Sequence, residues 1–423
     1  MNSQENKLFD VAIIGGGPAG MMAAIRASEL GASVVLVEKN NQFGRKLLLT
    51  GNGRCNLTNA EFDLRKLVSY YGPKGKFLFH AFSVFGPQST IDFFKSLGLM
   101  TKTEKDGRVF PQSNKAERVL FALSNRLIKN GVRTRYNSKI MKIYRENNRI
   151  NKLVMSDGRE IFAKNYIFCT GGKSFPGTGS DGAAFEFIQE LGHKIEKLSP
   201  ALVPIRIKEK WAKDLEGVTL QNVGIKVTQN NNKIAHIQGD CLLTHFGLSG
   251  PMILNLSKDI SGLPQSSPVT ISIDLHPALK AEDSDQHLQN LIKKFPNKLI
   301  KNFLGALFAP KLVPVLIKLI GIDPERQSHS ITKEERKKIA WFLNNLEMTV
   351  DSLLGFDVAM VTKGGVSLKE IDDKTMRSKI VDNLFFAGEM VDLDGPTGGF
   401  NLQIAWSTGF LAGEKAARFA LSS

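Results

Sequence analysis

The chain opens with three glycines whose spacing could hold the diphosphate of a dinucleotide. Gly15, Gly17 and Gly20 form the pattern G-x-G-x-x-G directly after an apolar run that starts at Val11. In such a pattern the first glycine permits a tight turn, the second lets the backbone approach the diphosphate, and the third lets the helix pack closely. Glu38 stands where a second strand should end, placed to accept the hydroxyls of an adenosine ribose. The spacing therefore predicts a site for an adenine dinucleotide.

The glycine pattern needs a strand–helix–strand unit around it, and the sequence predicts one. Residues 18–30 are compatible with a helix, and the β-branched residues at 33–37 predict the second strand. The unpaired N–H groups and the macrodipole at the start of that helix favour negative charge. This context turns a weak glycine pattern into a specific signal.

Two further apolar stretches also end at glycines. The strand expected at 161–169 leads into Thr170, Gly171 and Gly172, and the strand expected near 383–387 leads into Gly388. Ligands of an open parallel sheet bind beyond the carboxyl ends of its strands. Three such ends from distant parts of one chain therefore predict a single extended cofactor.

A set of ordered motifs resembles one family of flavoproteins. They are Gly44-Arg-Lys through Gly51-Asn-Gly-Arg-Cys-Asn56, Gly107-Arg-Val-Phe-Pro111, Gly172-Lys-Ser-Phe-Pro176, Gly179-Ser-Asp-Gly182, Thr244-His-Phe-Gly-Leu-Ser-Gly-Pro251, Thr375-Met-Arg-Ser-Lys379 and Gly388-Glu-Met-Val-Asp-Leu-Asp-Gly-Pro-Thr-Gly398-Gly-Phe-Asn-Leu-Gln403. Over nearly its whole length the chain is similar to the BaiN/YhiN-like NAD(P)/FAD-dependent oxidoreductases, which are of the two-dinucleotide-binding-domain type. The resemblance implies bound FAD, a nucleotide-binding domain, a six-stranded barrel-like insert and a helical subdomain.

The resemblance and the chemistry of the side chains together assign residues to the cofactor. The loop 44–56 offers backbone amides and the cations Arg45, Lys46 and Arg54 to a diphosphate and to the polar edge of the flavin. Ile140 is implied as the start of the strand whose backbone meets the adenine. The expected cofactor-binding residues are Gly15, Gly17, Pro18, Ala19, Gly20, Glu38, Lys39, Arg45, Lys46, Gly51, Gly53, Arg54, Cys55, Asn56, Ile140, Thr170, Gly171, Gly172, Gly388, Glu389, Asp392, Gly398, Gly399, Phe400 and Asn401.

Two of these positions leave an alternative open. Glu389 stands where many flavoproteins carry an aspartate that holds the ribityl chain, and either Glu389 or Asp392 takes that role. The segment 398–401 opens the last helix, whose first amides can stabilise the negative charge that develops at the flavin N1 edge when the ring accepts a hydride.

Composition places the chain among ordinary globular enzymes. It has 423 residues, of which 42% are hydrophobic and 23% charged. Its polar first residues contain no signal-peptide core, and its most apolar segment, 312–322, is too short and too interrupted to span a bilayer. Cys55, Cys169 and Cys241 form no C-x-x-C pair, which excludes a dithiol centre and a zinc knuckle. We expect a cytoplasmic protein without a transmembrane segment.

The net charge of +15 raises the question of an anionic partner. Most lysines are spread along the chain, and the clearest excess is at 289–320, where six lysines face no acid. We interpret these lysines as the solvated faces of amphipathic helices, and we expect a small-molecule substrate rather than a nucleic acid.

The predicted fold class is α/β. A Rossmann-like FAD-binding domain of the glutathione-reductase type is expected from both ends of the chain, at 1–199 and 356–423. A β-rich barrel-like insert is expected at 200–280, and a helical subdomain, lysine-rich and broken by prolines, at 281–355.

The expected reaction is the NAD(P)H-linked reduction of a small unsaturated substrate by hydride transfer through flavin N5. A flavin amine oxidase and an RNA-modifying flavoprotein remain alternatives. Reduction also needs a proton donor, for which His245 is the candidate, although a structural histidine is the alternative reading.

Three other features have competing interpretations. Cys55 beside Arg54 could have a lowered pKa near the flavin, or could be inert packing. The second G-x-G-x-x-G pattern, at 177–182, follows no strand closely, and we reject it as a NAD(P)H site. His193 is expected to be structural, and no histidine shows metal-ligand spacing.

Overall fold

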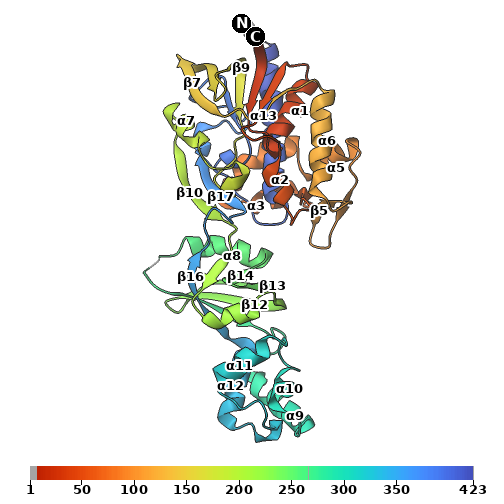
Figure 1. The fold of residues 1–423 in the computed structure, drawn as a ribbon, viewed down its shortest axis with the longest axis vertical. Helices are drawn as coiled ribbons and strands as arrows, with labels where there is room; N and C mark the ends of the chain where they lie inside the picture. The colour runs from red at the N-terminus through yellow and green to blue at the C-terminus, as the bar shows by residue number, and fades with distance from the viewer. Residues whose placement is uncertain (1–6, 265, 423) are drawn as a thin grey trace. The chain divides into compact units, whose positions relative to one another are not determined.

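The computed structural model describes residues 7–264 and 266–422, which divide into two compact units (Figure 1). The first unit comprises Met1–Pro200 and Ala359–Ser423, and the second comprises Ala201–Val358.

The first unit is built on a parallel sheet. Its strands follow the order β6-β2-β1-β9, and β18 pairs with β9 on the other side. An antiparallel meander of β8 and β7 extends the sheet beyond β9. The strands are β1 (Leu8–Ile14), β2 (Val34–Val37), β6 (Arg133–Arg135), β7 (Ile140–Glu146), β8 (Arg149–Met155), β9 (Glu160–Phe168) and β18 (Leu384–Phe386). The central strands are almost wholly buried, as expected for the parallel sheet of a Rossmann-like domain.

Helices α1 (Pro18–Glu29) and α13 (Phe400–Leu421) lie side by side against this sheet (Figure 1). Glycines on α13 allow the close contact, since an ideal Cβ at Gly409 or Gly413 would lie 2.4 Å from the carbonyl oxygen of Ala19 or Ala23. Any side chain at these two positions would force the helices apart. The two ends of the chain are thereby joined in one core.

The remaining elements of the first unit surround these. The helices are α2 (Arg45–Leu49), α3 (Leu64–Ser69), α4 (Phe79–Val84), α5 (Pro87–Ser96), α6 (Ala116–Lys129) and α7 (Ala184–Glu190). A small sheet contains β3 (Thr58–Asn59), β5 (Arg108–Pro111) and β4 (Thr101–Thr103), and β10 (Ile195–Ala201) pairs with β17 (Val361–Val366).

The second unit contains a closed six-stranded barrel, in the order β11-β14-β13-β12-β15-β16. Its strands are β11 (Ile205–Ile207), β12 (Thr219–Gln229), β13 (Asn232–Thr244), β14 (Gly247–Ser249), β15 (Val269–Asp274) and β16 (Leu346–Leu353). Its helices are α8 (Pro251–Ser261), α9 (Ser284–Lys294), α10 (Ile300–Leu304), α11 (Leu312–Ile320) and α12 (Lys333–Asn344). Alternate residues of β12 and β15 point into an apolar interior that is continuous with the buried faces of the helices.

The α/β class with a barrel-like and helical insert is confirmed, but the helical subdomain expected at 281–355 is wrong at its end. Residues Leu346–Leu353 form β16, which pairs with β15 and β11 and closes the barrel. The strands that pair with β16 are distant in sequence, and lysine-rich helices directly precede β16. The sequence pattern therefore favoured a continued helix over a strand. In the part of the chain that the structure describes, no helix is both long and apolar enough to cross a bilayer.

Candidate functional site

The three glycine clusters lie together at one edge of the main sheet. In register, Phe168 at the end of β9 faces Ile14 at the end of β1 and Phe386 at the end of β18. The turns that follow these strands therefore emerge side by side, as predicted from the three apolar stretches. This edge is where an open parallel sheet binds its ligand.

The first turn has the shape that a diphosphate needs. An ideal Cβ at Gly15 would lie 2.5 Å from the Cys169 carbonyl oxygen, and one at Gly20 would lie 1.8 Å from the Gly15 carbonyl oxygen, so the fold itself requires both glycines. A Cβ at Gly17 would meet no atom within 4 Å. Gly17 is also the N-cap of α1, and no capping side chain satisfies the first amides of this helix.

A polar atom without a partner lies beside the second cluster. Ser180 Oγ is buried and has no hydrogen-bond partner among the described residues, and it lies 2.9 Å from the ideal Cβ position of Gly171. A buried hydroxyl in this condition fits a bound polar group. Together with the open space at Gly17, it shows that the residues present suit a dinucleotide cofactor.

Glu38 follows β2 directly and supports the first turn. Its carboxylate accepts hydrogen bonds from Gly16 N–H at 2.8 Å and from Asn40 N–H at 2.9 Å, one on each oxygen. Each oxygen keeps a further lone pair for a ribose hydroxyl. Lys39 forms an ion pair with Asp181 at 2.7 Å. Ile140, at the start of β7, is buried near this end of β2.

Glu389 occupies a polar network that joins four segments. Its carboxylate accepts from Lys46 Nζ at 2.6 Å, from Ser174 Oγ at 2.5 Å and from Thr362 N–H at 2.8 Å. Burial raises the pKa of the Glu389 carboxyl, but Lys46 and the hydrogen bonds outweigh burial, so this pKa lies below its ordinary value. Lys46 is thus engaged by a carboxylate and by Ser174 Oγ. Glu389 is an ionised anchor for the turn after β18.

Asp392 forms a separate ion pair. Its Oδ1 lies 2.5 Å from Lys74 Nζ, and its side chain is 7% exposed. Burial raises the pKa of the Asp392 carboxyl above its ordinary value, although Lys74 opposes the shift. The two candidates for the ribityl role therefore differ in partner and in pKa.

In the loop 44–56, the cations have protein partners. Arg54 forms an ion pair with Glu104 at 2.8 Å, and its guanidinium lies 3.8 Å from the centroid of the Phe110 ring. Arg45 donates to the Asn41 side chain. Turns with positive φ at Gly51 and Gly53 leave the backbone of this loop exposed in part.

The start of the last helix is held against this loop. Gly399 has φ +98°, and an ideal Cβ there would lie 2.3 Å from the backbone of Thr58. With the side-chain amide of Asn56 oriented so that its nitrogen donates to the Thr58 and Val109 carbonyl oxygens, its oxygen accepts a hydrogen bond from Gly399 N–H at 2.9 Å. The Asn401 side chain binds Gly395 N–H and its carbonyl oxygen, so it shapes the preceding turn. No side chain caps α13, which leaves the amides that follow Gly399 for a ligand.

Cys55 is a buried thiol. It is fully buried, and burial raises its pKa to about 12. The low-pKa interpretation is therefore wrong, because the neighbouring Arg54 faces Glu104 and Phe110 while the thiol lies in the core.

We expect none of the cysteines to react with Ellman's reagent in the folded protein at about pH 8. Cys55, Cys169 and Cys241 are all free and buried, and burial raises the pKa of each. The control is the same assay in guanidinium chloride, where all of them should react. A rapid reaction of one thiol in the folded protein would contradict the buried placement.

The histidines have different environments. His245 lies in the second unit, after β13, with a side chain that is 65% exposed and 3.2 Å from Glu216. His193 is buried between Glu370, at 3.2 Å, and Ser378 Oγ, at 2.9 Å. Burial lowers the pKa of His193. Within the described residues no group of His, Cys, Asp and Glu could hold a metal ion.

Sequence reasoning did not single out three residues that complete these contacts. Ser174 lies inside a motif quoted above, so a polar role could have been inferred for it. Thr362, which accepts from the Lys173 and Ser174 amides, and Lys74 carried no local signal. The second glycine pattern, at 177–182, follows no strand directly, since β9 ends at Phe168.

Comparison with known proteins decides the family. The family model described as "HI0933-like protein Rossmann domain" matches residues 9–415. The chain belongs to the HI0933-like family. This family comprises FAD-dependent oxidoreductases, as the resemblance implied.

Relatives of this HI0933-like protein carry different names. It is 31% identical to a 3-dehydro-bile acid delta(4,6)-reductase of Clostridium scindens over 96% of this chain and 98% of the relative. It is 29% identical to a ribosomal RNA dihydrouridine synthase of Haemophilus influenzae, over 94% of this chain and 96% of the relative.

Solved structures share the fold. A 3-ketosteroid-delta4-(5alpha)-dehydrogenase from Rhodococcus jostii RHA1 matches with a TM-score of 0.56 and 14% identity, covering 98% of both chains. A flavocytochrome c3 fumarate reductase matches with a TM-score of 0.53 and 16% identity, covering 99% of this chain and 80% of that one.

Proposed function

We propose that this HI0933-like protein is a reductase that takes a hydride from NADH or NADPH and delivers it to a small molecule with a conjugated carbon–carbon double bond. The observation that carries the proposal is the convergence of three glycine turns at one sheet edge, with open space at Gly17. The relative named as a bile acid reductase, matched over 96% of this chain, supports the choice of a reductase.

The chain's own residues have defined tasks in this proposal. The amides at the start of α1 bind the diphosphate, and Glu38 accepts the ribose hydroxyls. Lys46 and Ser174 hold Glu389 so that the turn after β18 keeps its shape. The amides at the start of α13 stabilise negative charge. FAD, when bound, supplies the hydride transfer, through its N5 atom.

An anaerobic reduction tests the proposal. The protein is purified, FAD is identified by absorbance and mass, and NADH or NADPH is added while the flavin band is followed. Rapid bleaching is expected. If the band persists and dithionite still reduces it, nicotinamide is not the donor, and an amine or another oxidisable substrate takes its place.

His245 is the proposed proton donor for the second half of the reduction, because a hydride on one carbon requires a proton on the other. Its side chain is exposed and can meet a ligand. We expect His245→Ala to lower turnover by about 10²-fold on an identified substrate. His236→Ala, an exposed histidine on β13, is the matched control. Unchanged turnover in His245→Ala would show that His245 is not the proton donor.

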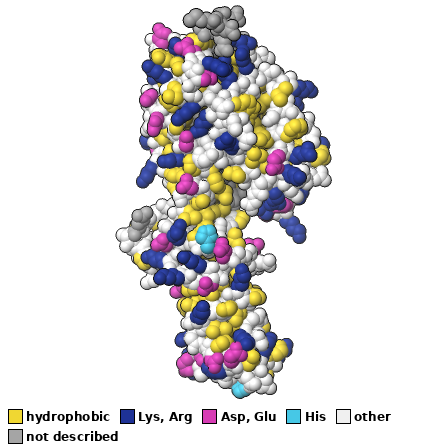
Figure 2. Space-filling model, viewed as in Figure 1, with side chains coloured by type: hydrophobic (Ala, Val, Ile, Leu, Met, Phe, Trp, Pro, Cys, Tyr) yellow, Lys and Arg dark blue, Asp and Glu magenta, His cyan; other side chains and the backbone are white. Residues whose placement is uncertain are grey.

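A second candidate function is the modification of RNA. It is favoured by the net charge of +15 and by the relatives named as ribosomal RNA dihydrouridine synthases. On the face shown in Figure 2, however, Lys and Arg are scattered among acidic side chains rather than gathered in a stripe. Titration with ribosomal RNA at low and high salt separates the two functions, since an RNA enzyme must bind with a steep salt dependence.

A further inference from the structure

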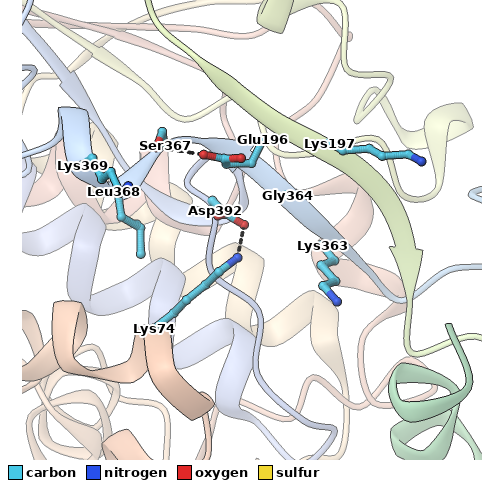
Figure 3. Close-up of a pocket in the computed structure, with 9 residues that line it drawn as sticks. All are labelled: Lys74, Glu196, Lys197, Lys363, Gly364, Ser367, Leu368, Lys369 and Asp392. Atoms are coloured by element: carbon cyan, nitrogen blue, oxygen red, sulfur yellow. Dashed lines mark hydrogen bonds and ion pairs between the residues drawn. The ribbon is translucent and has the colours of Figure 1, made fainter. Parts of the chain in front are cut away.

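The first unit contains a cavity of about 450 Å³ with a lining rich in lysine (Figure 3). This volume lies in the range of small-molecule sites. Lys74, Lys197, Lys363 and Lys369 line it together with Glu196 and Asp392. Figure 3 shows Lys74 reaching Asp392 in the middle, with Lys197 and Lys363 on one side and Lys369 on the other. No residue pattern in the sequence singled out these lysines as a group.

The backbone brings two of the lysines onto neighbouring strands. Lys197 lies on β10 and Lys363 on β17, which pair with each other. Gly364 permits the close approach, since it has φ +96° and an ideal Cβ there would lie 2.4 Å from the Lys197 carbonyl oxygen. The arrangement of the wall is therefore set by the fold.

The acids that line the cavity already have cationic partners. Asp392 is paired with Lys74 at 2.5 Å. Glu196 is paired with Lys194 at 3.0 Å and accepts from Ser367 Oγ at 3.1 Å.

The other three lysines of the lining have no acidic partner among the described residues. Across residues 7–264 and 266–422, the ammonium groups of Lys197, Lys363 and Lys369 form no ion pair. Four lysines and two acids line the cavity, so the lining carries a net charge of +2. Like charges in one cavity attract an anion from solution.

We propose that this cavity binds a small organic anion whose carboxylate or phosphate group lies beside Lys197 and Lys363, on the side of the cavity formed by β10 and β17. Charge-assisted hydrogen bonds from ammonium groups suit either group. Leu368 and the methylene stems of the lysines offer apolar contact to the rest of the ligand. The limited volume favours a small molecule over a polymer. That this anion is the substrate rests on the proposed reductase function, whereas the binding does not.

The test is calorimetric titration of the FAD-loaded protein with three probes: benzoate, phenyl phosphate and neutral benzyl alcohol. Benzoate or phenyl phosphate should bind, the better of the two identifying the anionic group, and benzyl alcohol should not. In the Lys197→Gln/Lys363→Gln variant the affinity for the anion should fall by about tenfold or more. Lys363→Glu should abolish binding. The matched control is Lys95→Gln, an exposed lysine on α5, which should bind as the unaltered protein does.

Several results would overturn the inference. They are equal binding in the Lys197→Gln/Lys363→Gln variant, equal binding of benzyl alcohol, and no binding of either anion to the unaltered protein. Anaerobic reduction by NAD(P)H is measured on the same samples. Lysine-dependent anion binding without flavin reduction would reject the reductase and keep the anion site. Flavin reduction by NAD(P)H without lysine-dependent anion binding would reject the anion site and keep the reductase.

Discussion

Gly17→Asp should abolish the retention of FAD while leaving the apoprotein as stable as before. Gly17 is the N-cap of α1, with φ −79° and ψ −174°, a conformation that aspartate adopts readily. The ideal Cβ meets no atom within 4 Å, so the substitution introduces no clash. The new carboxylate would accept hydrogen bonds from the first amides of α1 and would repel the diphosphate.

We expect the affinity for FAD to fall by about 100-fold or more, which corresponds to roughly 2.7 kcal/mol. The measurement is fluorescence titration of the apoprotein with FAD, together with thermal unfolding of the apoprotein. Aspartate at an N-cap is as good as or better than glycine, so the unfolding temperature should not decrease.

Gly177→Asp is the matched control. Gly177 is also in a G-x-G-x-x-G pattern, and its ideal Cβ also meets nothing within 4 Å. This second pattern follows no strand directly, so FAD binding should be unchanged. Normal FAD affinity in Gly17→Asp would show that the diphosphate does not lie at the start of α1.

The second large effect is expected for Lys46→Met. Lys46 and Glu389 form a 2.6 Å ion pair whose side chains are 22% and 21% exposed. Removal of the lysine leaves the carboxylate with Ser174 Oγ and the Thr362 amide as partners but without a countercharge. Loss of one partner of a buried pair costs about 3–5 kcal/mol, and partial exposure places this pair near the lower figure.

Urea denaturation of the variants measures this cost. Lys46→Met should lower the free energy of unfolding by about 3 kcal/mol, and Lys46→Met/Glu389→Gln should recover part of the loss because no unpaired charge remains. Additive effects of the two substitutions would show that the pair is not coupled.

The same variants should show a defined dependence on pH. The pKa of Glu389 in the folded protein is lowered from its ordinary value, mainly because Lys46 outweighs the opposing effect of burial. A lowered pKa means that the pair's stabilisation is fully present above the unfolded pKa of about 4.3 and is lost as the pH falls through the folded value. The difference between the unaltered protein and Lys46→Met should therefore be constant near neutral pH and shrink in acid. A difference that grows in acid would contradict this sign.

The sequence by itself determined the nucleotide-binding unit. The spacing of Gly15, Gly17 and Gly20 and the apolar strands around them are local properties, because turn geometry and strand burial depend on nearby residues. Each of the three apolar strands ends at glycines, and the carboxyl ends of parallel strands lie at one edge of a sheet. The structure has β1, β9 and β18 as neighbours in the sheet. The barrel was implied by motifs that resemble the family.

Only the tertiary structure decided what the charged and nucleophilic side chains do. The partner of Glu389 is Lys46, which is 343 residues away in sequence, and Asp392 meets Lys74 across 318 residues. Cys55 lies in the core, where burial raises its pKa, rather than at the surface beside Arg54. Strand β16 likewise formed through pairing with β11, more than a hundred residues earlier in the chain. Burial, ion pairing and barrel closure depend on which distant segments pack together, and local spacing does not encode those contacts.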